Sequence, residues 1–171
     1  MPLPLGFTSE CEYVDLTLQS NMMPYMIESL EKSLPDGMTL YDARAVLDKR
    51  ASLSSALNRV VYRVDTAFWE DSEKLRGMVR TALDADILEV ERQGKKETKR
   101  IDIRPVVFDL TILENNLVME LGIGDEGYVR PGELLYFLAA GLKADIAALS
   151  VHRCAFYRIE SDGSRIDPME L

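Results

Sequence analysis

The chain contains few of the residues from which metal and redox centres are built. It has one histidine, His152, and two cysteines, Cys11 and Cys154, which lie far apart and form no Cys-x-x-Cys pair. A lone histidine without clustered cysteines or carboxylates is seldom a metal ligand, so the sequence predicts no metal site and no cofactor. Isolated cysteines in an intracellular protein are typically reduced and partly buried; a disulfide between them is the alternative, without support in the sequence.

Long apolar runs and an excess of positive charge are also absent. No run approaches the length that spans a bilayer, and no basic region followed by an apolar stretch begins the chain. The 20 basic residues against 29 acidic ones give a net charge of −9, which disfavours non-specific attraction to nucleic acid or to an anionic membrane. We therefore expect a cytoplasmic protein with no membrane partner.

No recognisable catalytic arrangement is present. No Gly-x-Ser-x-Gly motif surrounds a serine. Residues 122–127 match Gly-x-Gly-x-x-Gly, but this segment is acidic and no downstream ribose-binding carboxylate follows it convincingly. The clustered Glu10, Glu12 and Asp15 are more typical of an acidic strand end than of an acid–base pair. The sequence predicts that the chain is not an enzyme; the alternative, a hydrolase or transferase, rests only on scattered carboxylates around His152.

Strand and helix patterns follow one another along the chain. Strands are predicted over residues 14–18, 39–46, 57–65 and 151–159, hairpins over 87–104 and 110–123, and helices over 23–34, over 72–83 and from Pro131. From residue 51 onward this order is typical of an α+β, ferredoxin-like (split βαβ) antiparallel sheet with an extra hairpin strand. Its crossovers should leave both helices on one sheet face, and the tail after Glu160 is predicted to be mobile.

The first fifty residues predict only strand, helix and strand. This order is that of the back half of a second ferredoxin-like unit. The polar segment 48–55 is the best candidate linker. The sequence therefore predicts a partial ferredoxin-like unit over residues 1–50, followed by a complete ferredoxin-like domain over residues 51–171.

A charged stripe is the first candidate binding surface. Arg100, Asp102 and Arg104 are spaced two apart, so a regular strand places them on one face. With Lys95, Lys96 and Lys99 on the preceding turn, this face is a candidate contact for an anion or RNA. The alternative is a solvated outer face with cross-strand ion pairs, which guards a sheet edge against aggregation. We favour the alternative.

The start of the last helix is the second candidate. Arg130 precedes Pro131, and its guanidinium could join backbone N–H groups there in holding an anion. The alternative is a helix-entry signal in which Arg130 pairs with Glu133. We favour the alternative because Glu133 already occupies the positive end of the helix dipole.

The last predicted strand carries two further candidates. His152 is interpreted as a strand histidine with satisfied hydrogen bonds, and Arg153 as a residue that contacts a partner. Tyr62, Phe156 and Tyr157 are expected in the core or an interface, the alternative being stacking on RNA bases across an open sheet face.

Several segments together resemble one family, the radical SAM-linked proteins, a domain of unknown function encoded beside or fused to a radical SAM enzyme. The matching segments are Pro2–Leu16, Leu34–Gly37, Ile101–Pro105, Val129–Leu135 and Val151–Arg153. The resemblance implies an accessory module that recruits or presents an RNA or protein substrate to a radical SAM enzyme. The alternative is an RNA-binding domain that acts independently, in keeping with the occurrence of the family near RNA-processing genes. In either case we expect the contacts to come from Arg100, Arg104, Arg130 and Arg153.

The chain departs from this family in two respects. It has no Cys-x-x-x-Cys-x-x-Cys run, so it does not itself hold the iron–sulfur cluster of a radical SAM enzyme. Typical members also carry a further strand and a basic helix ahead of the Pro-Leu-Gly segment. We therefore expect a fragment or shortened form with an exposed strand edge and an uncovered apolar face, which favour pairing with another copy.

Overall fold

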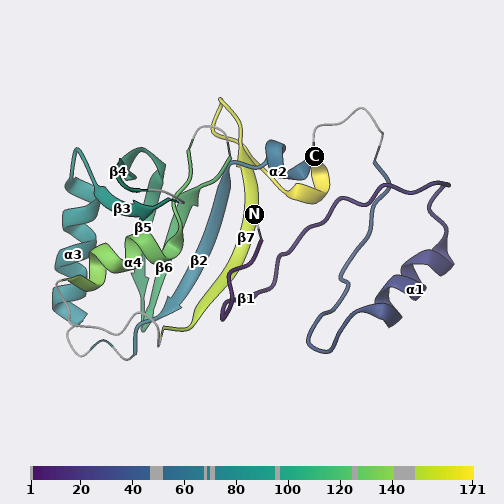
Figure 1. Ribbon diagram of the computed structural model, residues 1–171, viewed down its shortest axis with the longest axis horizontal. Helices are drawn as coiled ribbons and strands as arrows, with labels where there is room; N and C mark the ends of the chain where they lie inside the picture. The colour runs from purple at the N-terminus through teal and green to yellow at the C-terminus, as the bar shows by residue number, and fades with distance from the viewer. Residues whose placement is uncertain are drawn as a thin grey trace.

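The computed structural model describes residues 2–46, 52–67, 69, 72–94, 97–124, 127–140 and 149–171, which form a mixed α+β structure (Figure 1). The elements are β1 (Thr8–Ser9), α1 (Pro24–Ser33), α2 (Leu53–Ala56), β2 (Arg59–Asp65), α3 (Ser72–Asp84), β3 (Glu89–Gln93), β4 (Thr98–Asp102), η1 (Arg104–Val106), β5 (Val107–Leu113), β6 (Asn116–Gly122), α4 (Pro131–Ala140), β7 (Val151–Ile159), β8 (Arg165–Ile166) and η3 (Pro168–Glu170). Within these residues, no helix combines the length and apolar character needed to cross a membrane.

The main sheet has the strand order β1-β7-β2-β6-β5, with β8 also paired to β7. Neighbours among β7, β2, β6 and β5 are antiparallel. Consequently β2 and β5 run parallel, with β6 between them, and α3 lies between them in the chain. In the same way β6 and β7 flank β2 and are joined through α4. The predicted α+β class is confirmed, while the β3–β4 hairpin forms a separate two-stranded sheet.

The core lies between one face of this sheet and helices α3 and α4. The β2 side chains of Val60, Tyr62 and Val64 are fully buried, whereas the intervening positions are less buried. The other buried side chains of this core include Leu117, Met119 and Leu121 of β6, Leu75 and Val79 of α3, and Leu134 and Leu138 of α4. Because one side of each strand is apolar and buried, both helices cover the same face, as the crossover rules predict.

The predicted strand–helix–strand order of the first fifty residues is only partly correct. The helix is confirmed as α1, but residues 10–23 and 34–46 contain no strand. In the described structure these alternating segments pair with no strand, and the edge of β7 is paired with β1 and β8. Large apolar side chains of this segment, among them Val14, Leu16 and Tyr41, are therefore exposed. The predicted pairing of this segment with another copy stays a prediction.

Two predicted irregular segments are structured. Within the proposed linker, residues 48–51 lie outside the described residues, but residues 53–56 form α2. The tail after Glu160, predicted to be mobile, turns at Gly163, which has a φ of 84°, and returns as β8 along β7. Asp167 then caps η3 by accepting a hydrogen bond from the Met169 N–H at 2.8 Å. The tail is thus structured, with Pro168 buried and Leu171 packed against the core, while its mobility stays a prediction.

Gly122 at the end of β6 should tolerate no side chain. A Cβ there would lie 2.8 Å from the Cβ of Val106, a contact that backbone movement must relieve. We expect Gly122→Ala to lower the free energy of unfolding by about 1–3 kcal/mol, because overpacking strains a filled core. The matched control is Gly77→Ala in α3, where a Cβ meets nothing within 4 Å. It should raise the free energy of unfolding by about 1 kcal/mol through helix propensity. Urea denaturation measures both, and equal effects would contradict the packing argument.

Candidate binding site beside a buried arginine

A β-bulge in β7 brings Arg153 and Phe156 to the same sheet face. Tyr62 pairs with Arg153, but the β2 residue before it pairs with Ala155, so Cys154 is the extra residue of the bulge. An extra residue reverses the alternation of side chains beyond it. Arg153 and Phe156, three residues apart on β7, therefore both point to the sheet face that the helices cover, which is also the face of Tyr62.

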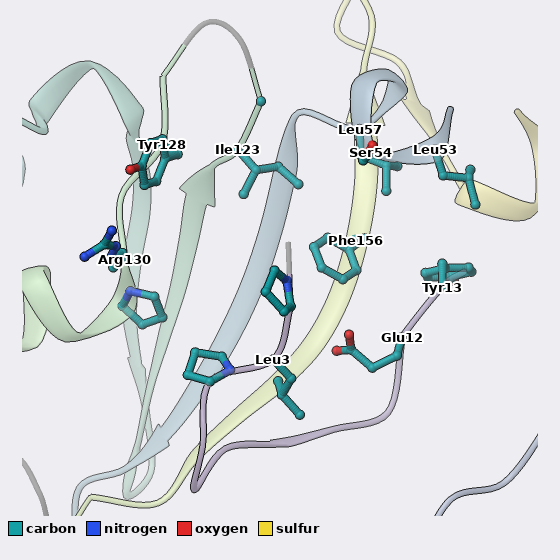
Figure 2. A pocket seen from close by; sticks show the side chains of 14 residues that line it. Leu3, Glu12, Tyr13, Leu53, Ser54, Leu57, Ile123, Tyr128, Arg130 and Phe156 are labelled. Atoms are coloured by element: carbon teal, nitrogen blue, oxygen red, sulfur yellow. The ribbon is translucent and has the colours of Figure 1, made fainter. Parts of the chain in front are cut away.

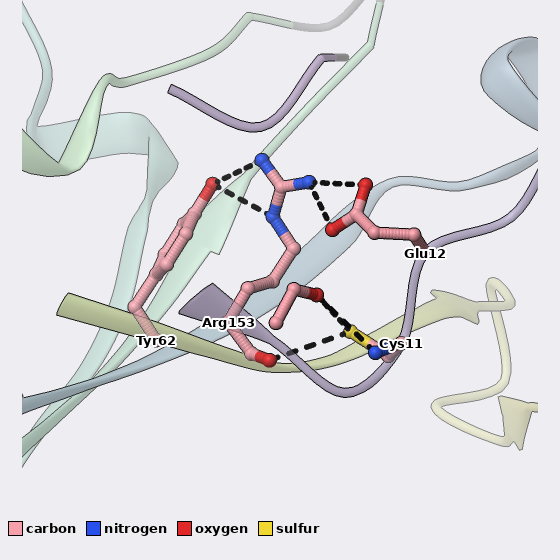
Figure 3. Close-up of polar contacts among 5 residues, drawn as sticks. Cys11, Glu12, Tyr62 and Arg153 are labelled. Carbon is pink, nitrogen blue, oxygen red and sulfur yellow. Dashed lines mark hydrogen bonds and ion pairs between the residues drawn. The ribbon is translucent and has the colours of Figure 1, made fainter. Parts of the chain in front are cut away.

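The Arg153 guanidinium is fully buried, and its hydrogen bonds extend in two directions (Figure 3). Nη1 donates to the two carboxylate oxygens of Glu12 at 2.7 and 2.9 Å. Nη2 and Nε donate to the Tyr62 hydroxyl at 3.1 and 3.3 Å. The guanidinium also lies 4.8 Å from the ring centroid of Phe156. Burial raises the pKa of the Tyr62 phenol, so this hydroxyl stays neutral as it accepts both bonds.

The N-terminal strap, residues 2–13, is fastened to β7 through the same arginine. β1 pairs in parallel with β7, and the Glu10 N–H donates to the carbonyl of Arg153 at 3.2 Å. The rings of Phe7 and Tyr13 make edge contacts with Tyr62 and Phe156, at centroid distances of 6.3 and 6.4 Å. The strap therefore covers the part of the sheet face next to β7.

A cavity of about 600 Å³ lies between the strap, α2, β7 and the start of α4 (Figure 2). Its walls are mainly apolar and are formed by Pro2, Leu3, Pro4, Leu53, Leu57, Ile123, Gly124, Pro131 and Phe156, with Glu12, Tyr13, Ser54, Tyr128 and Arg130 as the polar members. Arg130 and Tyr128 lie on one side of the cavity, and Glu12 and Tyr13 on the other. This size and lining are typical of sites that take a small molecule or a few side chains of a partner.

Two cavity-lining residues, Tyr128 and Arg130, contact an ion pair that the sequence did not predict. Glu133 accepts hydrogen bonds from Nε and Nη2 of Arg92 at 2.6 and 2.7 Å, and from the backbone N–H of Arg130 at 3.0 Å. Arg92 also lies over the ring of Tyr128, 4.2 Å from its centroid. The ion-pair partner of Glu133 is therefore Arg92 on β3 rather than the Arg130 side chain, which is exposed at the cavity.

The predicted stripe of Arg100, Asp102 and Arg104 does not form one face. β4 ends at Asp102, and Arg104 begins η1, so the strand alternation stops before it. Arg100 is exposed and pairs across the hairpin with Glu91. Lys95 and Lys96 lie outside the described residues. Whether Arg100 contacts a partner stays a prediction.

Arg104 and Asp102 connect the hairpin to α3. The Arg104 guanidinium donates to the carbonyls of Leu83, Ala85 and Val107 at 2.9, 3.1 and 2.7 Å. Oδ1 of Asp102 accepts from the backbone N–H groups of Leu88 and Arg104, at 2.8 and 2.9 Å. Arg104 thus satisfies carbonyls at the end of α3, where a helix leaves them without partners.

His152 has one satisfied ring nitrogen. Its Nδ1 lies 2.7 Å from Oγ1 of Thr8 on β1. Its Nε2 is buried without a hydrogen-bond partner, 3.6 Å from Oε2 of Glu10. The prediction of a satisfied strand histidine therefore holds for only one of the two nitrogens.

Comparison with known proteins identifies a family but no function. The model of a family described as "Uncharacterized protein conserved in bacteria (DUF2344)" matches residues 1–131. This range includes the strap, the cavity residues up to Pro131 and Glu12, but not Arg153 or Phe156. No curated protein and no solved structure matches the chain.

Removing the Glu12 carboxylate should destabilise the fold. Glu12→Gln leaves the buried Arg153 guanidinium without its counter-charge. We expect the free energy of unfolding to fall by about 2–3 kcal/mol, below the full cost of a deeply buried pair because Glu12 is half exposed. The matched control is Glu97→Gln, whose ion pair with Lys99 is largely exposed and should contribute under about 0.5 kcal/mol. Similar losses in both variants, measured by urea denaturation, would contradict this role.

Stability should depend on pH through Glu133. Burial by itself raises the pKa of this carboxyl, but hydrogen bonds from Arg92 and the Arg130 N–H outweigh it and lower the pKa. Its stabilising contribution is therefore present above the unfolded-state pKa of about 4.3 and is lost as pH falls through the lower folded-state pKa. Glu133→Gln should weaken the fold at neutral pH and reduce this acid-dependent loss. Denaturation at several pH values tests this, with the exposed Glu73→Gln as control; an unchanged slope in Glu133→Gln would refute it.

Proposed function

The chain belongs to the family of uncharacterized proteins conserved in bacteria (DUF2344), and we propose that it is a non-catalytic binding module for a protein segment. The cavity of about 600 Å³ between the strap and the sheet carries this proposal. A segment of a protein substrate inserts an apolar or aromatic side chain there. Following the resemblance to radical SAM-linked proteins, the module presents this segment to a radical SAM enzyme in the cytoplasm.

The lining supports binding more than chemistry. Among the described lining residues, the carboxylate is that of Glu12, and both of its oxygens already accept hydrogen bonds from Arg153 within the fold. The remaining lining is largely apolar, with hydroxyls of Ser54 and two tyrosines. Apolar walls with a few oriented polar groups favour recognition of shape and of one apolar anchor.

Charge favours a protein segment with an acidic residue beside its apolar anchor. Arg130 is exposed at one side of the cavity, where it can pair with a carboxylate of the bound segment. The chain as a whole has a net charge of −9, which opposes binding of a polyphosphate backbone. On the basic hairpin, Lys99 lies 3.0 Å from Glu97 and Arg92 pairs with Glu133. RNA binding is therefore the second candidate, and within the described part of this hairpin it is the exposed Arg100 that supports it.

The fold suits this role if the main domain is ferredoxin-like. The strand order β7-β2-β6-β5, with α3 and α4 as crossovers between parallel strands, supports that assignment. The segment up to residue 50 would then be part of a second such unit. Contacts with the enzyme are proposed for Arg100 and Arg130, because the guanidinium groups of Arg104 and Arg153 are engaged within the fold.

The test compares two leucines of the strap. Leu3 lines the cavity, whereas Leu5 is fully exposed and does not line it. The protein substrate of the radical SAM enzyme encoded beside the gene is titrated against this chain, and its affinity is measured. Leu3→Asp should weaken binding about tenfold or more, because a carboxylate in an apolar cavity costs well over 1.4 kcal/mol. Leu5→Asp should bind as the unchanged chain does.

Unchanged affinity of Leu3→Asp would refute the cavity as the binding site. The RNA alternative is tested by titrating single-stranded RNA over a series of salt concentrations. Binding that weakens steeply with salt, is lost in Arg100→Glu and is unaffected by Leu3→Asp would establish RNA binding in place of the cavity proposal.

A further inference from the structure

Glu10, His152 and Cys154 form a cluster apart from the cavity. A carboxylate oxygen, an imidazole nitrogen and the thiol sulfur of these residues all lie within 4.8 Å of one another. Glu10 is nearly the length of the chain away from His152 and Cys154 in sequence, so its proximity to them comes from the fold. Adjacent side chains of a strand point to opposite faces, so His152 lies on the other side of β7 from Arg153.

Strand pairing accounts for the cluster. In the parallel pairing of β1 with β7, Thr8 lies beside His152 and Ser9 beside Arg153. The chain continues to Glu10, whose N–H is held by the Arg153 carbonyl at 3.2 Å. On the other strand, Cys154 is the extra residue of the β-bulge, two positions from His152. The register of β1 and the bulge of β7 thus deliver the three side chains to one place.

The hydrogen bond of His152 leaves its second ring nitrogen available to bind a ligand. Thr8 Oγ1 lies 2.7 Å from Nδ1, and we assign Nδ1 as the donor, which leaves a lone pair on Nε2. Nε2 is buried and without a hydrogen-bond partner, which is uncommon for a buried polar atom. A second hydrogen bond that fixes the tautomer and ring orientation is a usual feature of histidines that bind metals.

We infer that Glu10, His152 and Cys154 bind a zinc ion, with an open fourth position for water. A thiolate and an imidazole favour zinc over magnesium or calcium, which prefer oxygen ligands. Zinc–ligand bonds of about 2.0–2.3 Å require the ligand atoms to approach one another by roughly 1 Å. The half-exposed Glu10 side chain permits this approach. As the zinc–sulfur bond forms, the Cys154 thiol gives up its proton to solvent.

Such an ion fixes the strap to β7. β1 is only two residues long, so few backbone hydrogen bonds hold it. Zinc would join Glu10 of the strap to two side chains of β7, close to the attachment that Glu12 makes through Arg153. The ion therefore stabilises the folded chain and does not depend on the proposed cavity ligand.

The full chain, freed of metal by a chelator, is titrated with zinc, and with cobalt as a spectroscopic probe. We expect one ion per chain, a thiolate-to-cobalt charge-transfer band, and a thermal midpoint that rises with zinc concentration. Cys154→Ser removes a ligand and should abolish the band. It should also weaken zinc binding by more than the roughly 10- to 100-fold that follows when a residue hydrogen-bonded to a metal ligand is removed. Thr8→Val should weaken zinc binding by roughly 10- to 100-fold.

The matched control is Cys11→Ser, which removes the other thiol and should keep both the band and the affinity. Glu10→Gln provides an exposed ligand variant that should fold if Cys154→Ser does not, and it should also bind zinc more weakly. No binding of one ion per chain, a band that persists in Cys154→Ser, or unchanged zinc affinity in Glu10→Gln would overturn the inference. These outcomes leave the cavity proposal unaffected, because Leu3→Asp tests it separately.

Discussion

The attachment of the strap to the sheet depends on the burial of Arg153. A guanidinium without solvent must be paired and hydrogen-bonded, and Tyr62 and Glu12 together supply acceptors for it. Tyr62 on the sheet holds the guanidinium of Arg153 in place, and this guanidinium in turn binds the Glu12 carboxylate of the strap. Since the strap forms one wall of the cavity, the shape of the candidate site depends on this hydrogen-bonded pair.

Other arginines have similar roles within the fold. Arg92 joins the hairpin to the start of α4 through Glu133, and Arg104 joins it to the end of α3. Because the chain is acidic, carboxylates as well as carbonyls are available as acceptors for buried guanidinium groups. The five N–H donors of one guanidinium can hydrogen-bond to several helices and strands at once. For this reason Arg104 of the predicted stripe is an internal connector, whereas Arg100 of the same stripe is exposed. Arg130, exposed beside the cavity, is the exception most useful to a ligand.

The long periodic segments could be predicted because their patterns report burial directly. β2, α3 and α4 each present one apolar face, and the structure buries those faces together. The pattern of residues 14–18 is as regular, but this segment pairs with no strand of the described sheets, which the pattern itself does not reveal. The bulge at Cys154 has no sequence signature, so neither the alignment of Arg153 with Phe156 nor its link to Glu12 could be predicted.

The acidic cluster of the strap illustrates why chemistry depends on register. In sequence Glu10 and Glu12 are two carboxylates of a solvated strand end. In the structure each meets a basic side chain of β7, Glu12 at Arg153 and Glu10 near His152. Because adjacent β7 residues point to opposite faces of the sheet, the Glu12–Arg153 and Glu10–His152 contacts lie on opposite sides of β7. A shift of one residue between β1 and β7 would exchange the faces and break both contacts, so the short β1 pairing sets the geometry of the cavity and of the Glu10–His152–Cys154 cluster together.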